Sequence, residues 1–146
     1  MKKVIPKQRK VKTTLAWFDL GCYPGEMLFA NGMDYNQLVK ALNKYKATNW
    51  LIGIEDESDL INNATWLALK RVVRNTKTSE ETKLFYILIR DPFKFTDENY
   101  SLLAHEVVHI CQFFLEDILD RNKEKEAEAY LHTHIMKLCL KALRGK

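Results

Sequence analysis

The sequence contains no apolar run long enough to cross a bilayer, and it has few cysteines. No stretch approaches the roughly 18 uncharged apolar residues of a membrane-spanning helix. The basic N-terminal segment is not followed by an apolar region, so it lacks the form of a secretory signal. Cys22, Cys111 and Cys139 are odd in number and widely spaced, which favours neither a disulfide framework nor a zinc knuckle. We therefore expect a cytoplasmic protein that does not enter a membrane.

Repeats, low-complexity segments and interdomain linkers are also missing. The 146 residues are enough for one domain with a substantial core. Apolar residues make up 47% of the chain and charged residues 29%, as in ordinary globular proteins. We expect a single domain over residues 13–146.

Positive charge is concentrated at the N-terminus. Residues 1–12 contain six lysines and arginines and no acidic residue, so the rest of the chain carries −2 of the formal net charge of +4. A basic segment of this kind can contact nucleic acid or another anionic surface. It has no interleaved aromatic residue, however, and no nucleic-acid-binding motif occurs elsewhere. We expect residues 1–12 to form a flexible, solvated basic arm.

Hydrophobic periodicity and turn residues predict an α+β fold, a small sheet with helices. Strands are expected at residues 11–20, 26–31, 50–54 and 83–90, the first two as a hairpin. Helices are expected at residues 35–46, from Asp56 or Ser58 to residue 74, from Thr96 or Asp97 to residue 119, and at residues 123–143. Residues 75–81 are polar and predict a loop. The short connection between the last two helices predicts an antiparallel pair.

Residues 105–109 read His-Glu-Val-Val-His, a pattern typical of zinc metallopeptidases. Two residues four apart on a helix lie about 40° apart around its axis, so His105 and His109 can bind one metal ion from the same side. Glu106 lies in a neighbouring sector, where it can act on water at the metal. The alternative is that both histidines are neutral core residues bonded to backbone carbonyls, with Glu106 at the helix surface.

The surroundings of the motif favour the metal. Residues 102–119 are apolar almost all round the predicted helix, which is the pattern of a buried helix. Burying a carboxylate and two imidazoles without partners is unfavourable by several kcal/mol. A metal ion bound by the histidines, with Glu106 hydrogen-bonded to water at the metal, removes that penalty.

A catalytic zinc ion usually has three protein ligands and one open position. The next helix begins with Glu124, Glu126 and Glu128, and helical geometry alone does not choose between them. Cys111 follows His109 by two residues, which is the wrong face for the same ion.

The order of motifs resembles small metallopeptidases carried by phages and prophages, similar in plan to the minimal gluzincins. The matching residues are 103–109 (LAHEVVH) and 126–131 (EAEAYL), and the resemblance covers roughly residues 83–136. It implies a zincin-like fold, in which the active-site helix is followed by a C-terminal glutamate helix. It also implies Zn²⁺ ligands His105, His109 and Glu126, with Tyr130 facing the same site. An acidic residue at position 128 departs from the pattern and keeps Glu128 open as the ligand.

The resemblance further implies hydrolysis of peptide bonds through a metal-activated water, with Glu106 as the general base. The strand at residues 83–90 is expected beside the cleft, where an edge strand holds an extended peptide substrate. Tyr130, His132 and His134 are candidate donors to the oxyanion. The expected apolar stripe of the last helix puts His134 in the core and His132 toward solvent; its members are Ala127, Leu131, His134, Ile135, Leu138 and Ala142.

Two other functions are compatible with the sequence. The first is a non-catalytic, zinc-bound regulatory module, which the intact Glu106 disfavours because a purely structural site needs no base. The second is a nucleic-acid-associated protein that acts through its basic arm.

Overall fold

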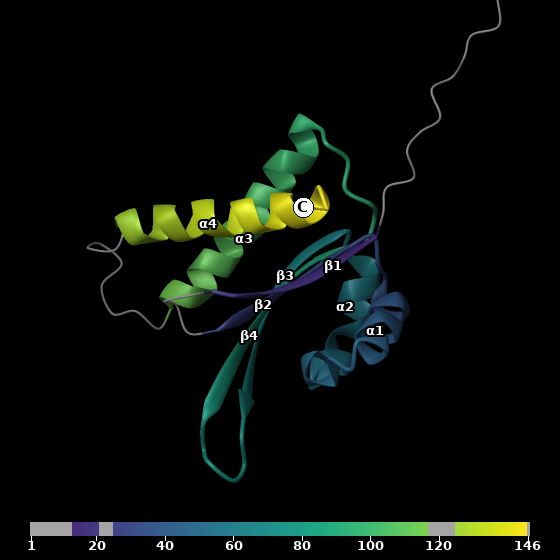
Figure 1. The fold of residues 1–146 in the computed structure, drawn as a ribbon, viewed down its shortest axis with the longest axis vertical. Helices are drawn as coiled ribbons and strands as arrows, with labels where there is room; N and C mark the ends of the chain where they lie inside the picture. The colour runs from purple at the N-terminus through teal and green to yellow at the C-terminus, as the bar shows by residue number, and fades with distance from the viewer. Residues whose placement is uncertain (1–12, 21–24, 117–124, 146) are drawn as a thin grey trace, which may run out of the picture.

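The computed structural model describes residues 13–20, 25–116 and 125–145, excluding the side chains of residues 125 and 126. The expected basic arm therefore lies outside the described residues. The fold is α+β, as predicted, with three layers (Figure 1). A four-stranded sheet lies in the middle, α3 (Asp97–Leu115) and α4 (Lys125–Leu143) cover one face, and α1 (Tyr35–Lys44) and α2 (Ser58–Asn63) cover the other.

The strands are ordered β1 (Thr14–Asp19), β2 (Glu26–Asn31), β4 (Glu81–Ile89) and β3 (Trp66–Arg74). β1 and β2 are antiparallel, as predicted, β2 and β4 are parallel, and β3 and β4 form a second antiparallel pair. In the described sheet β1 and β3 are therefore the edge strands, and β4 is an inner strand. The expectation that residues 83–90 form an edge strand is wrong.

The sheet separates two hydrophobic cores because side chains alternate along each strand. Phe85 and Ile87 of β4 pack toward α3 and α4, whereas Leu84, Tyr86 and Leu88 pack toward α1 and α2. Such strands are buried on both faces, which accounts for the continuous apolar sequences of β2 and β4.

The α1 layer differs from the prediction between residues 47 and 63. α1 begins at the expected cap: Asp34 accepts from the Gln37 backbone N–H, and the Gln37 side chain accepts from the Asp34 N–H. The predicted strand at residues 50–54 is wrong, since two 3-10 helices occupy this region, η1 (Thr48–Leu51) and η2 (Ile54–Glu57). Trp50 and Ile54 both belong to the core beneath α1, which accounts for the apolar sequence without a strand.

The predicted long helix ending at residue 74 is also wrong. α2 ends at Asn63, and Trp66–Arg74 form β3, which pairs with β4 along its whole length. Trp66 and Ala68 pack on one face of the sheet, and Leu67 and Leu69 pack on the other. This alternation has the period of a strand buried on both faces, and an apolar run of this kind is not distinguished from a buried helix by periodicity alone.

Tyr86 provides a test of the inner core. Its buried hydroxyl donates to the Trp50 carbonyl oxygen at 2.8 Å, and burial raises its pKa above the ordinary value of 10.0, against the opposing charge of Arg71. Because the pKa of Tyr86 is higher in the folded state than in the unfolded state, the protonated Tyr86 hydroxyl stabilises the fold. This stabilisation is complete below pH 10 and is lost as pH rises further. Tyr86→Phe should lower the free energy of unfolding by about 1–3 kcal/mol at pH 7, since it leaves a buried carbonyl unpaired.

Above pH 10 the raised pKa of Tyr86 should lower the free energy of unfolding of the wild-type protein by up to about 1.4 kcal/mol per pH unit. Tyr86→Phe should lack this contribution to the alkaline decline. Urea denaturation between pH 7 and 11 measures both effects. Tyr45→Phe, at an exposed tyrosine, is the matched control and should change neither. Equal stability of the two variants at pH 7 would contradict the buried hydrogen bond.

Two contacts fix the entry into α3. The buried Asn31 side chain accepts from the Phe93 backbone N–H at 2.7 Å, tying the end of β2 to the segment before the helix. Thr96 caps α3 by accepting from the Asn99 N–H, one of the two caps predicted. α3 is described to Leu115, and the predicted continuation to residue 119 lies outside the described residues.

α4 packs across α3, and the predicted pairing of the two helices is confirmed (Figure 1). Its buried face differs from the prediction, because Leu131, Ile135 and Cys139 form the stripe that enters the core. This face includes position 132 rather than position 134. Among the described helices, none combines the length and the apolarity needed to span a bilayer.

Candidate metal centre

His105 and His109 bring two ring nitrogens to one point on α3. Their Nε2 atoms are 3.1 Å apart, and the rings are nearly perpendicular, with an interplanar angle of 86°. Two nitrogen ligands at about 2.05 Å from a tetrahedral zinc ion are about 3.3 Å apart. The separation therefore fits two ligands of one ion, and the convergence expected from the His-x-x-x-His spacing is observed.

Gln112 orients the second histidine. His109 Nδ1 lies 3.2 Å from Gln112 Oε1, and because an amide oxygen can only accept, Nδ1 carries the proton in this contact. In that tautomer His109 Nε2 presents a lone pair toward His105. A partner of this kind, which fixes tautomer and ring orientation, commonly supports metal-binding histidines. Gln112 was not predicted as part of the site, although its position three residues after His109 places it on the same helical face.

Glu106 is enclosed between α3 and β3. Its side chain is 7% exposed, and burial raises the pKa of the carboxyl group above its ordinary value. The nearby imidazoles of His109 and His105 and a hydrogen bond from the backbone N–H of Ala68 act in the opposite direction. A carboxylate with a raised pKa, partly held by an N–H donor, accepts a proton more readily than an ordinary carboxylate does.

The histidine face of α3 is open, contrary to the expectation of a helix buried all round. His105 and Gln112 are exposed, and His109 is half-buried. The sheet covers the opposite face of α3, and β3, rather than the predicted strand at residues 83–90, runs beside the motif. Lys70 of β3 forms an ion pair with Glu116 at the end of α3, with a Nζ–Oε2 distance of 3.6 Å.

The described residues do not supply a third metal ligand. They contain no group of three histidine, cysteine or acidic side chains able to hold a metal ion. The Glu126 side chain, the ligand implied by the resemblance, and all of Glu124 lie outside the described part. Glu128 is half-buried, and its carboxylate contributes to raising the pKa of Cys111, after the larger effect of burial, to about 12. Glu128 therefore lies within electrostatic reach of Cys111 and completes no metal-binding group with the two histidines. Cys111 is buried in the core, away from the histidine face.

The candidate oxyanion donors occupy different environments. Tyr130 is 68% exposed on α4. His132 is half-buried, and its Nε2 donates to the Ala104 carbonyl oxygen at 3.3 Å, next to His105. His134 is exposed. The predicted environments of His132 and His134 are thus wrong, because the packing face of α4 is rotated relative to the expected stripe.

A pocket of about 570 Å³ adjoins the N-terminal half of α3. Trp66 of β3 and Leu102 and Glu98 of α3 are among its lining residues. Leu102 and Glu98 precede His105 by three and seven residues, so they lie on the same helical face as the histidines. The pocket continues this face toward the first residue of β3.

The arrangement combines two convergent imidazoles, a buried carboxylate and an adjoining pocket beside an edge strand. Each of these features comes from the side chains and backbone of this chain. No protein-family model, curated protein or solved structure matches the chain.

Proposed function

We propose that this protein is a zinc-dependent metallopeptidase with a zincin-like active site. The observation that carries the proposal is the 3.1 Å separation of His105 Nε2 and His109 Nε2 on an open helical face, next to the buried carboxyl group of Glu106. A hydrogen bond between two neutral imidazoles also fits this distance. It does not, however, account for the buried carboxyl group of Glu106 beside the two histidines, which a catalytic metal site uses as a base.

We propose His105, His109 and one glutamate of α4 as the zinc ligands. Positions 126 and 128 differ by about 200° around a helix, so these two glutamates are alternatives for one ion. The resemblance favours Glu126. The described Glu128 carboxylate lies near Cys111, which is buried away from the histidine face, and it completes no group of three possible metal ligands among the described residues. We therefore assign the third position to Glu126 and keep Glu128 as the competing assignment.

In this proposal the protein side chains divide the chemical work. A bound zinc ion supplies Lewis acidity and increases the acidity of a bound water. Glu106 accepts a proton from the attacking water and delivers it to the leaving amine. Gln112 maintains the His109 tautomer in which Nε2 is free of a proton. We propose Tyr130 as the hydrogen-bond donor to the oxyanion, because the resemblance implies that Tyr130 faces the metal site.

The substrate is proposed to be a peptide bound in extended form along β3. Ala68 directs its N–H out of the sheet toward Glu106, so the outer edge of β3 borders the motif helix. An extended peptide added to this edge would form main-chain hydrogen bonds. The pocket beside Trp66 and Leu102 would then receive a substrate side chain.

The proposal is tested by metal binding and by peptide digestion. After zinc supplementation and removal of excess metal, the protein should contain one zinc ion per chain, and His105→Ala should contain none. Digestion of a diverse peptide library should give cleavage that a chelator abolishes and zinc restores. A stoichiometric zinc ion without cleavage would favour a non-catalytic zinc module, and absence of zinc would exclude both.

A further inference from the structure

A groove of about 580 Å³ lies at the β1 edge of the sheet, opposite the edge that borders the candidate metal centre. Its floor is formed by residues 13–15 at the start of β1. One wall contains Lys44 and Tyr45 from the end of α1, and the other is formed by residues 142–145 at the end of α4. We call this feature the basic groove.

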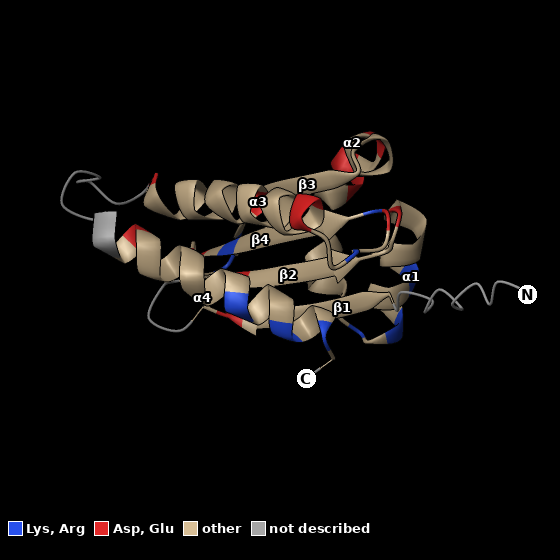
Figure 2. Ribbon diagram, turned by 90° about the horizontal axis from the view of Figure 1, so that it is seen from above, with Lys and Arg blue, Asp and Glu red and all other residues tan. Residues whose placement is uncertain are grey.

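The charge of the groove has one sign. Lys44 and Arg144 stand on opposite walls, and no acidic side chain occurs among its described lining residues. Figure 2 shows blue segments along α4 and α1, whereas α2 and the start of α3 carry red. Residues 1–12, with six basic side chains and no acidic one, join the chain at Thr13, which itself lines the groove. The groove is therefore complementary to a polyanion.

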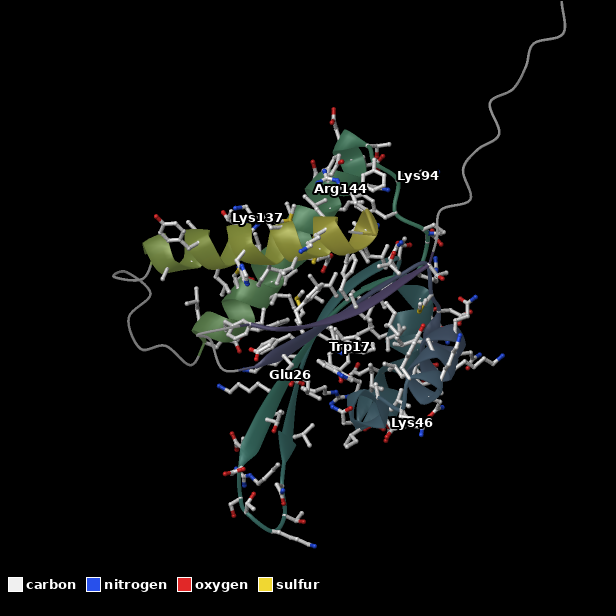
Figure 3. The ribbon with its side chains drawn as sticks, viewed as in Figure 1. Trp17, Glu26, Lys46, Lys94, Lys137 and Arg144 are labelled. Atoms are coloured by element: carbon white, nitrogen blue, oxygen red, sulfur yellow. The ribbon has the colours of Figure 1, made fainter. Side chains whose placement is uncertain are left out.

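Two exposed aromatic rings extend the groove. Tyr45 is 57% exposed and Trp17 is 48% exposed, and their ring centroids are 6.0 Å apart. Lys44 Nζ lies 5.7 Å from the Tyr45 ring centroid. Figure 3 shows Trp17 and Lys46 on the α1 side of the sheet and Arg144 at the end of α4. The aromatic pair thus adjoins the α1 wall of the groove beside Lys44, and Arg144 lies on the α4 wall.

We propose that the basic groove binds single-stranded nucleic acid. Lys44 and Arg144 would contact backbone phosphates, and Tyr45 and Trp17 would stack against unpaired bases. This pairing of a positive groove with exposed aromatic rings is how sequence-tolerant single-strand binding is achieved. A duplex keeps its base faces stacked internally, and an acidic peptide offers carboxylates without a stacking face. The aromatic pair therefore favours a single strand over either.

The test measures binding of a fluorescein-labelled dT20 to the full-length chain by fluorescence anisotropy at several salt concentrations. The double variant Lys44→Glu/Arg144→Glu should bind at least tenfold more weakly at about 0.1 M salt. Its slope of log K against log salt should fall by about 1.4, or about 0.7 for each lost phosphate contact. Lys77→Glu, which reverses one charge in the exposed β3–β4 turn, is the control. It should change the affinity for dT20 less than twofold.

Stacking is tested by tryptophan fluorescence with unlabelled dT20. Binding should quench the wild-type protein, and Trp17→Leu should lose the quench and bind roughly tenfold more weakly. Tyr45→Leu provides a second variant, and thermal melting confirms that each is folded. The proposal is overturned if wild-type protein does not bind dT20 at low salt, if duplex DNA or polyglutamate binds equally well, or if the double variant matches the charge control. Loss of binding on deletion of residues 2–12, with no effect of the groove variants, would also overturn it.

Discussion

Glu106→Gln is expected to abolish peptide hydrolysis while zinc binding and the fold are retained. The amide has the size of the carboxylate and can still accept the hydrogen bond from the Ala68 N–H, but it cannot take a proton from water. Loss of a general base lowers turnover by about 10²- to 10⁴-fold. Chelator-sensitive cleavage of a peptide substrate measures the loss, and metal analysis measures the retained zinc.

Glu116→Gln makes the same chemical change on the same helix, at a half-exposed side chain, and should preserve turnover. Wild-type activity in Glu106→Gln would remove Glu106 from the mechanism. Because burial raises the pKa of Glu106, activity should also decline on the acid side at a higher pH than an ordinary carboxylate would give. Catalysis requires deprotonated Glu106, so activity should rise with pH over the range in which Glu106 loses its proton.

The second large effect is expected at the third ligand. Glu126→Ala should weaken zinc binding by more than about a hundredfold, beyond the range found for outer-shell partners of metal sites. Glu128→Ala should have a small effect, because the Glu128 carboxylate lies near Cys111, away from the histidine face. Competition with a chromogenic chelator gives both affinities, and thermal melting without zinc checks that both variants fold.

The reverse order would transfer the ligand role to Glu128 without removing the metal site. Equal, near-wild-type affinity of both variants would show that neither glutamate binds zinc. The comparison therefore separates the identity of the third ligand from the existence of the centre, which depends on His105 and His109.

Local sequence signals predicted the parts of the fold in which neighbouring residues determine the outcome. Asp34 and Thr96 were recognisable as helix caps because each side chain bonds to a backbone N–H three residues away. The convergence of His105 and His109 also follows from helical spacing alone. β2 was predicted with its observed bounds because its short apolar sequence lies between a glycine turn and Gly32.

Long-range packing decided the features that the sequence did not reveal. The residues of β3 have apolar side chains that suit either a helix or a strand, and pairing with β4 selects the strand. The edge position of β3 depends on strand order, which local patterns do not encode. The face of α4 was misassigned because buried Cys139 was not counted among its apolar positions. The same rotation changes the environments of His132 and His134 and bears directly on the choice of glutamate.

The β3–β4 hairpin extends beyond the rest of the sheet (Figure 1), and residues 74–82 are all exposed at its end. An exposed turn of this kind tolerates insertion, because lengthening a surface loop adds little closure entropy. It is therefore the natural attachment point for a fluorophore or an affinity handle. A reporter placed there would leave the histidine face of α3 and the opposite edge strand unobstructed.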